Sequence, residues 1–138
     1  MPEINIKQVI SEWKDELKRQ IKPDMKLTII QIGNNAASNS YIKGKKKDCE
    51  ELGINFELCH YEENVEPTLI YEHIKKATNP IIVQLPVPKQ IDINIINNLI
   101  SPNLDVDGFS PLSKFKQCTP NGIIHLLDKL KFGFLNYL

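Results

Sequence analysis

Residues 27–32 read LTIIQI, and the chain turns at Gly33-Asn34-Asn35 directly after them. These six residues are rich in side chains that favour a strand, and a glycine with two asparagines is typical of a turn. A helical pattern then runs from about residue 37 to residue 52 and ends at Gly53, a residue common at helix C-termini. The order strand, turn, helix predicts the first half of a βαβ unit.

The same alternation continues on both sides of this unit. Apolar residues at helical spacing precede it, before Pro23, at Ile6, Val9, Ile10, Trp13, Leu17 and Ile21. Further strands are expected at 54–59 and 81–85, and further helices at 67–77, from Asp92 and from Thr119-Pro120. The last two helices are expected to bury Ile95, Ile96, Leu99, Ile100 and Ile123, Ile124, Leu127, Leu130. This pattern predicts an α/β fold, a small three-layer α/β/α domain with a mostly parallel sheet of βαβ units.

Composition excludes several classes of protein. The chain has 138 residues, seventeen basic and seventeen acidic, so one neutral domain is expected. A neutral chain lacks the surplus of Lys and Arg that holds nucleic acid, and its apolar runs are too short to span a bilayer. The N-terminus lacks a leader pattern, and three cysteines without a C-x-x-C pair suit a reducing compartment. We therefore expect a cytoplasmic protein that binds neither nucleic acid nor membrane.

Residue spacing excludes two kinds of site. The six glycines lie at least nine positions apart, so neither G-x-G-x-x-G nor G-x-x-x-x-G-K-[ST] is present. A glycine-rich cradle for nucleotide phosphates is therefore not expected. The histidines His60, His73 and His125 follow no zinc-binding spacing, so no metal site is expected. For Cys59-His60, a packed cysteine beside a surface histidine is favoured over a metal site, because strand neighbours face opposite sides.

Acid–base chemistry is suggested by two side chains on the helix after the first strand. Tyr41 and Lys45 are four residues apart and project from one face, near the strand ends where parallel sheets bind ligands. A phenol beside an amine is a plausible acid–base pair. The lysines around them, at 43–47, form either a phosphate patch or a solvated helix face paired with Glu50 and Glu51, and the second is favoured.

Three further features follow the later strands. Gln84 interrupts an apolar strand at its carboxyl end, either as a satisfied core amide or as a ligand contact, with equal support. Residues 85–88, LPVP, form a stiff apolar lip suited to one wall of a planar ligand site. Asp105 and Asp107 share a turn with Gly108 but lack the remaining ligands of a calcium loop. A carboxylate there can accept two hydrogen bonds from a 2-aminopyrimidinone, which points to a pterin or purine.

Taken together, these segments resemble the bifunctional methylenetetrahydrofolate dehydrogenase / methenyltetrahydrofolate cyclohydrolase family. The matching stretches are IGNNAAS (32–38), SYIKGKKKDCEELGI (40–54), VQLPVP (83–88), DVDGF (105–109) and CTPNGI (118–123). They cover roughly residues 4–130 and are similar to the family's amino-terminal catalytic domain. The resemblance implies an enzyme of folate one-carbon metabolism that acts on tetrahydrofolate derivatives.

The resemblance also implies catalytic positions. Lys45 falls on the catalytic lysine of the family's Tyr-x-x-x-Lys motif, with Tyr41 stacking on or near the folate and Gln84 assisting the lysine. In such a site, water adds to the methenyl carbon of 5,10-methenyl-tetrahydrofolate and the lysine relays the proton as a general acid–base. The product is 10-formyl-tetrahydrofolate. A methionine at the lysine position is not expected to support this step.

Substrate-binding positions follow in the same way. Val83 and Leu85 are expected to flank the substrate together with Tyr41, Lys45 and Gln84, and Asp107 is expected to hold the pterin edge.

The chain departs from the family pattern after Phe109, where the connecting segment is shorter and Gln117 replaces the first proline. It ends at Leu138, whereas family members continue into a dinucleotide-binding domain. We therefore expect residues 1–138 to be the tetrahydrofolate dehydrogenase/cyclohydrolase catalytic (folate-binding) domain, with the nicotinamide-binding domain absent. No cofactor is expected in this chain, and the NADP that the family implies is expected to require the missing domain.

Two functions stay open. The first is a cyclohydrolase that does not carry out the NADP-dependent dehydrogenase step alone. The alternative is a catalytically inactive or incomplete folate-binding module of the same fold. A separate cofactor domain, or self-association through residues 131–138, would be the protein partner.

Overall fold

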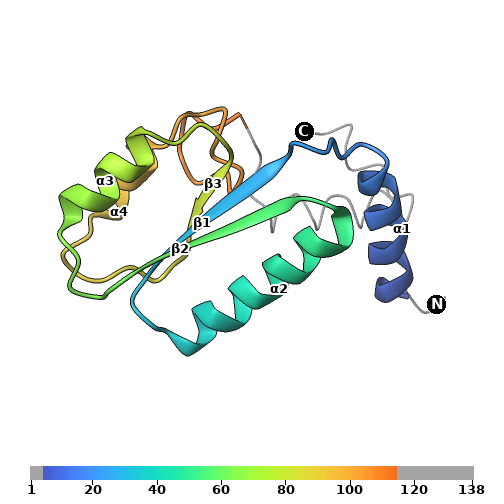
Figure 1. Ribbon diagram of the computed structural model, residues 1–138, viewed down its shortest axis with the longest axis horizontal. Coiled ribbons are helices and arrows are strands. Elements are labelled where there is room, and N and C mark those ends of the chain that lie inside the picture. The colour runs from blue at the N-terminus through green and yellow to red at the C-terminus, as the bar shows by residue number, and fades with distance from the viewer. Residues whose placement is uncertain (1–4, 115–138) are drawn as a thin grey trace.

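The computed structural model describes residues 5–114, and the elements follow the order expected from the sequence. They are α1 (Ile6–Lys18), β1 (Lys26–Ile32), α2 (Ala36–Leu52), β2 (Asn55–Tyr61), α3 (Pro67–Lys75), β3 (Ile81–Val83) and α4 (Ile93–Leu99), shown in Figure 1. The helix predicted from Thr119-Pro120 lies outside the described residues.

The three strands form a parallel sheet in the order β2-β1-β3. β1 pairs with β2 along its whole length and with β3 over residues 28–30. One isolated bridge between Ile81 and Asp105 continues the sheet beyond β3. Because the strands are parallel, their carboxyl ends lie at one edge of the sheet, where ligands bind in this class of fold.

Alternating side chains of β1 divide the core between two faces of the sheet. Ile30 packs in one cluster with Ile70 of α3 and Ile96 of α4. Ile29 packs on the other side with Ile42 of α2. Figure 1 accordingly shows α2 on one face and α3 with α4 on the other. The predicted three-layer α/β/α arrangement with a parallel sheet is confirmed.

β3 is shorter than predicted and ends at Val83 instead of residue 85. The Gln84 N–H still donates to the Ile30 carbonyl oxygen at 2.9 Å. Beyond it, Pro86 and Pro88 have no N–H with which to extend the ladder. The strand therefore stops where the candidate site begins.

α4 differs from the prediction at one apolar position. Ile95, expected in the core, is 43% exposed, whereas Ile93 packs against the core instead. The helix begins at Ile93 after its N-cap Asp92. Ile93, Ile96 and Ile100 then recur at spacings of three and four residues, which places them on one face and turns Ile95 away from it.

None of the helices within residues 5–114 combines the length and the apolar character needed to cross a bilayer.

α2 ends at Gly53, whose left-handed backbone (φ +78°) directs its N–H to the Cys49 and Glu50 carbonyls. A methyl group added at Gly53 would meet no atom within 4 Å. The energetic cost of the substitution therefore comes from the left-handed backbone and not from a steric clash. We expect Gly53→Ala to lower the free energy of unfolding by about 1 kcal/mol. Urea denaturation followed by circular dichroism measures this change.

Gly44 provides the matched control, because it lies in the interior of the same helix with equally open surroundings. Alanine has the higher helix propensity there, so Gly44→Ala should raise the free energy of unfolding by about 0.5–1 kcal/mol. Changes of the same sign in both variants would contradict this account.

Candidate functional site

The carboxyl end of β3 and the middle of α2 meet through one side-chain hydrogen bond. Lys45 Nζ donates to Gln84 Oε1 at 2.8 Å. On α2, Ile42 and Cys49 are buried, Ile42 against the sheet, and Lys45 lies three residues after Ile42 and four before Cys49. That spacing places Lys45 on the same stripe and directs it toward the sheet. The structure thus brings together two of the predicted site residues.

The Gln84 amide is held in one orientation. Its Nε2 donates to the backbone oxygen of Leu85 at 3.2 Å, which leaves Oε1 for Lys45. Ser38, buried in the first turn of α2, donates its hydroxyl to the same Leu85 oxygen at 3.0 Å. The amide therefore has protein partners and is also part of the Lys45 site, so the two sequence-based alternatives for Gln84 are not exclusive.

A buried amide that was not predicted lies near this site. Gln31, 5% exposed on β1, donates its Nε2 to Asn39 Oδ1 at 2.6 Å. Asn39 Nδ2 donates in turn to Asn34 Oδ1 at 2.7 Å, which joins the first turn of α2 to the turn after β1. The signal that could have revealed Gln31 is the one that revealed Gln84, a polar residue inside an apolar strand.

Tyr41 lies one helical turn before Lys45 on α2 and is 63% exposed. Lys45 is partly buried, so the two side chains share a side of the helix but differ in depth. An exposed aromatic ring beside a more buried amine offers a flat surface on which a planar ligand can stack. The position of Tyr41 therefore suits a ligand that also reaches Lys45.

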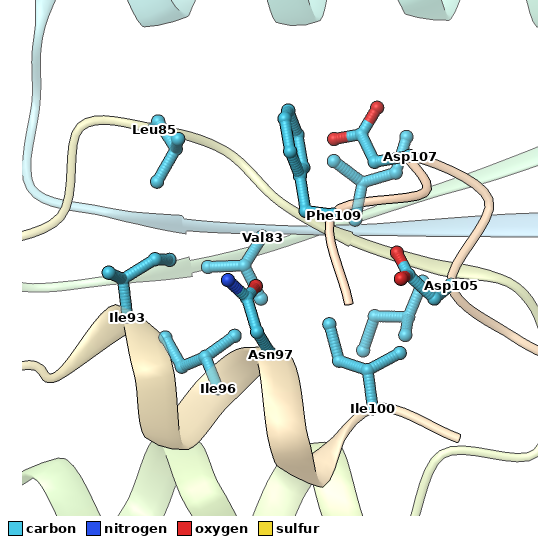
Figure 2. A pocket seen from close by; sticks show the side chains of 11 residues that line it. Val83, Leu85, Ile93, Ile96, Asn97, Ile100, Asp105, Asp107 and Phe109 are labelled. Atoms are coloured by element: carbon cyan, nitrogen blue, oxygen red, sulfur yellow. The ribbon is translucent and has the colours of Figure 1, made fainter. Parts of the chain in front are cut away.

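The other predicted residues, Val83, Leu85 and Asp107, line a cavity of about 60 Å³ at the edge of β3 (Figure 2). Phe109 and the apolar side chains of α4 complete its wall. The volume has room for only a few water molecules and is far below the roughly 300 Å³ or more of a typical ligand pocket. The cavity can admit the edge of a larger ligand but cannot enclose it.

Leu85 connects the two halves of the site. Its backbone oxygen binds Ser38 and Gln84 beside Lys45, and its side chain lines the cavity.

A rigid turn carries Asp107 at the rim of this cavity, and Figure 2 shows its carboxylate on the α2 side. Asp105, only 2% exposed, accepts the Gly108 N–H at 3.1 Å and the Ser110 N–H at 2.8 Å through separate carboxylate oxygens. Gly108 has a left-handed φ of +70°, which lets the chain reverse without strain. The two predicted carboxylates therefore have different roles. Asp105 stabilises the turn through its hydrogen bonds, and Asp107 lies on that turn.

The lysine cluster of α2 faces mainly solvent, with exposed side chains at Lys43, Lys46 and Lys47. The predicted pairing of this cluster with Glu51 is wrong, because Glu51 instead binds Lys14 of α1 at 2.8 Å. Asp48 binds the same lysine at 2.8 Å. These hydrogen bonds raise the pKa of Lys14 above its ordinary value. They connect α1 to α2 on the exposed side of the molecule.

Cys59 and His60 are arranged as predicted. Cys59 packs against the core, and burial raises the pKa of its thiol. His60 is exposed and contacts the Gly33 carbonyl oxygen through Nε2 at 2.8 Å. Over residues 5–114, no three His, Cys, Asp or Glu side chains gather in a way that could hold a metal ion.

Comparison with known proteins gives a consistent result. Residues 4–107 match the family described as tetrahydrofolate dehydrogenase/cyclohydrolase, catalytic domain. The chain is 36% identical to the bifunctional protein FolD of Exiguobacterium sibiricum over 92% of its own length and 49% of that protein. It is 33% identical to FolD of Staphylococcus epidermidis over 88% and 49%, respectively. The chain thus spans about half the length of these curated relatives.

Solved structures show the same likeness. The bifunctional FolD methylenetetrahydrofolate dehydrogenase/cyclohydrolase of Campylobacter jejuni is 31% identical with a TM-score of 0.79, over 91% of this chain and 52% of that one. The Trypanosoma brucei enzyme, solved with NADP and an inhibitor, shares the fold at 22% identity and a TM-score of 0.81, over 95% and 53%. On its sequence match and its fold, the chain belongs to the tetrahydrofolate dehydrogenase/cyclohydrolase family.

Proposed function

We propose that residues 1–138 form a folate-binding catalytic domain that hydrolyses 5,10-methenyl-tetrahydrofolate to 10-formyl-tetrahydrofolate. The observation that carries this proposal is the 2.8 Å hydrogen bond from Lys45 Nζ to Gln84 Oε1 at the carboxyl edge of the sheet. Family membership supports the substrate class. The chain spans about half of its relatives, so the proposed activity rests on the site itself.

The reaction needs water and one group that moves protons. Water attacks the cationic methenyl carbon, and the new C–O bond turns it into a tetrahedral centre that must lose the water proton. Cleavage of the bond from that carbon to N5 leaves the formyl group on N10, while N5 takes up a proton and one proton is released overall. A lysine amine held by Gln84 can accept the first proton and return one to N5.

The remaining residues would orient the folate. Tyr41 offers an exposed ring on the Lys45 side, and Asp107 lies on the turn at the cavity. Val83 and Leu85 line the cavity beside Asp107. A carboxylate accepts paired N–H groups of an aminopyrimidinone, which would fix one end of the bicyclic ring while its reactive carbon faces Lys45.

The residues present do not fit an NADP site. The glycines with positive φ, Gly33, Gly53 and Gly108, lie in separate turns. The 138 residues contain no glycine-rich phosphate loop. We infer that the dehydrogenase step, which the names of the relatives include, requires a nicotinamide-binding domain outside residues 1–138.

The Lys45→Met substitution tests the proton relay. It keeps a long apolar side chain but removes the amine, so hydrolysis of 5,10-methenyl-tetrahydrofolate should slow by about 100-fold or more. The decay of the methenyl chromophore with time measures the rate.

Lys47→Met is the matched control, because Lys47 is exposed on the same helix and points away from Gln84. It should keep the unmodified rate. If the unmodified chain and Lys45→Met both match buffer while folate still binds, the alternative of an inactive folate-binding module replaces the cyclohydrolase proposal.

Asp107→Asn tests the hold on the pterin edge. An amide replaces one acceptor with a donor that faces the ring N–H groups, so the folate Kd should rise about 10- to 100-fold. Titration calorimetry measures this Kd, with Asp24→Asn as a control, because the exposed Asp24 lies before β1 at the opposite end of the sheet. An unchanged Kd for Asp107→Asn would remove this contact from the proposal.

A further inference from the structure

We propose that Phe109 is a ligand-contacting residue, whose aromatic ring packs on one face of the planar heterocycle whose N–H groups Asp107 accepts. The inference rests on the proposed function, because it concerns the same ligand. It adds a residue for which no role was predicted from the sequence.

The backbone is fixed on both sides of Phe109. The buried carboxylate of Asp105 accepts the Gly108 N–H at 3.1 Å and the Ser110 N–H at 2.8 Å. These two donors directly precede and follow Phe109 in the chain. The aromatic ring is therefore attached to a rigid turn, and a ligand that packs on it has little backbone motion to restrain.

The ring of Phe109 borders the cavity but does not fill it, and the side chain is 48% exposed. Figure 2 shows the ring on the α2 side of the strand end, between Leu85 and Asp107. Burial of an apolar ring is favourable in proportion to the area removed from water. A ring held in this position therefore gains from a ligand that covers it.

Other exposed apolar side chains lie on the same side of the strand end. Leu85, beside Phe109, is 41% exposed. Tyr41 is 63% exposed on the side of α2 from which Lys45 reaches Gln84. Single exposed apolar side chains are normal on a protein surface, whereas a group of them bordered by polar residues is typical of a binding site.

Asp107 and Phe109 would recognise different parts of one ring. A carboxylate accepts hydrogen bonds from N–H groups at the ring edge, in the plane of the ring. An aromatic side chain instead packs on the flat face in an offset stack, whatever the groups at the edge. A carboxylate alone also binds an amine of any shape, so the added contact with Phe109 would select a planar ligand.

The test measures the Kd of folic acid, whose pteridine ring is planar, by titration calorimetry on the full chain. Phe109→Leu keeps an apolar side chain but removes the aromatic face, so this Kd should rise about three- to tenfold. Phe109→Tyr keeps the aromatic ring, so its Kd should stay within about twofold of that of the unmodified chain. The difference between the two variants separates the aromatic face from apolar volume.

Leu69→Ala is the control, because Leu69 is 58% exposed on α3, which covers the opposite face of the sheet. It should leave the Kd unchanged. Phe109 is about half exposed, so Phe109→Leu should unfold at the same urea concentration as the unmodified chain. This second measurement separates a lost ligand contact from a loss of fold.

An unchanged Kd for Phe109→Leu overturns the inference, and the proposed function survives if methenyl hydrolysis continues. An equal rise in the Kd of both Phe109 variants, or a rise that accompanies unfolding at lower urea, would identify Phe109 as merely structural and also overturns it. An unmodified chain that does not bind folic acid overturns the proposed function together with the inference.

Discussion

The parallel ladder between β1 and β3 runs as far as the Gln84 N–H, which donates to the Ile30 carbonyl oxygen at 2.9 Å. The position of Gln84 at the end of this ladder determines where the rest of the site lies. Continuing the register by one residue places Gln31 beside Gln84, both on the face that α2 covers. Since α2 begins directly after β1, its first three turns pass over these two amides. Lys45, in the third turn of α2, reaches Gln84 Oε1 at 2.8 Å.

The sheet face that α2 covers becomes polar toward the carboxyl ends of the strands. Ile29 lies in an apolar cluster, but Gln31, two residues later on the same face, is 5% exposed and hydrogen-bonded to Asn39. A satisfied hydrogen bond contributes only about 1 kcal/mol of net stability, whereas an unsatisfied one costs more. The amides are therefore better explained by orientation than by stability. They fix which atom of Gln84 faces Lys45 and how the first turn of α2 sits on the sheet.

Sequence predicted those features that depend on neighbouring residues along the chain. The strand at 27–32, the helix that ends at Gly53 and the layer order all follow from local periodicity and turn chemistry, and the structure confirms them. The rule that parallel strands end at one edge of the sheet places Lys45 and Gln84 at the same edge. Their hydrogen bond could not be predicted, because it depends on the register of β1 against β3.

Other features depended on packing that periodicity does not determine. The role of Ser38 depends on a backbone oxygen 47 residues away, and no pattern within α2 reveals it. The exposure of Ile95 depends on where α4 begins.

The side-chain alternation of a strand explains why the site is divided. Val83 and Gln84 are neighbours, so Val83 faces the layer of α3 and α4 while Gln84 faces α2. The Lys45–Gln84 hydrogen bond and the cavity lined by Val83 therefore lie on different sides of one strand end, joined by Leu85. Figure 2 shows Asp107 and Phe109 on the α2 side of the strand end. A ligand that reaches both Lys45 and Asp107 would therefore lie on that side, where Tyr41 is exposed, and outside the cavity of about 60 Å³, which is too small to enclose a bicyclic ring.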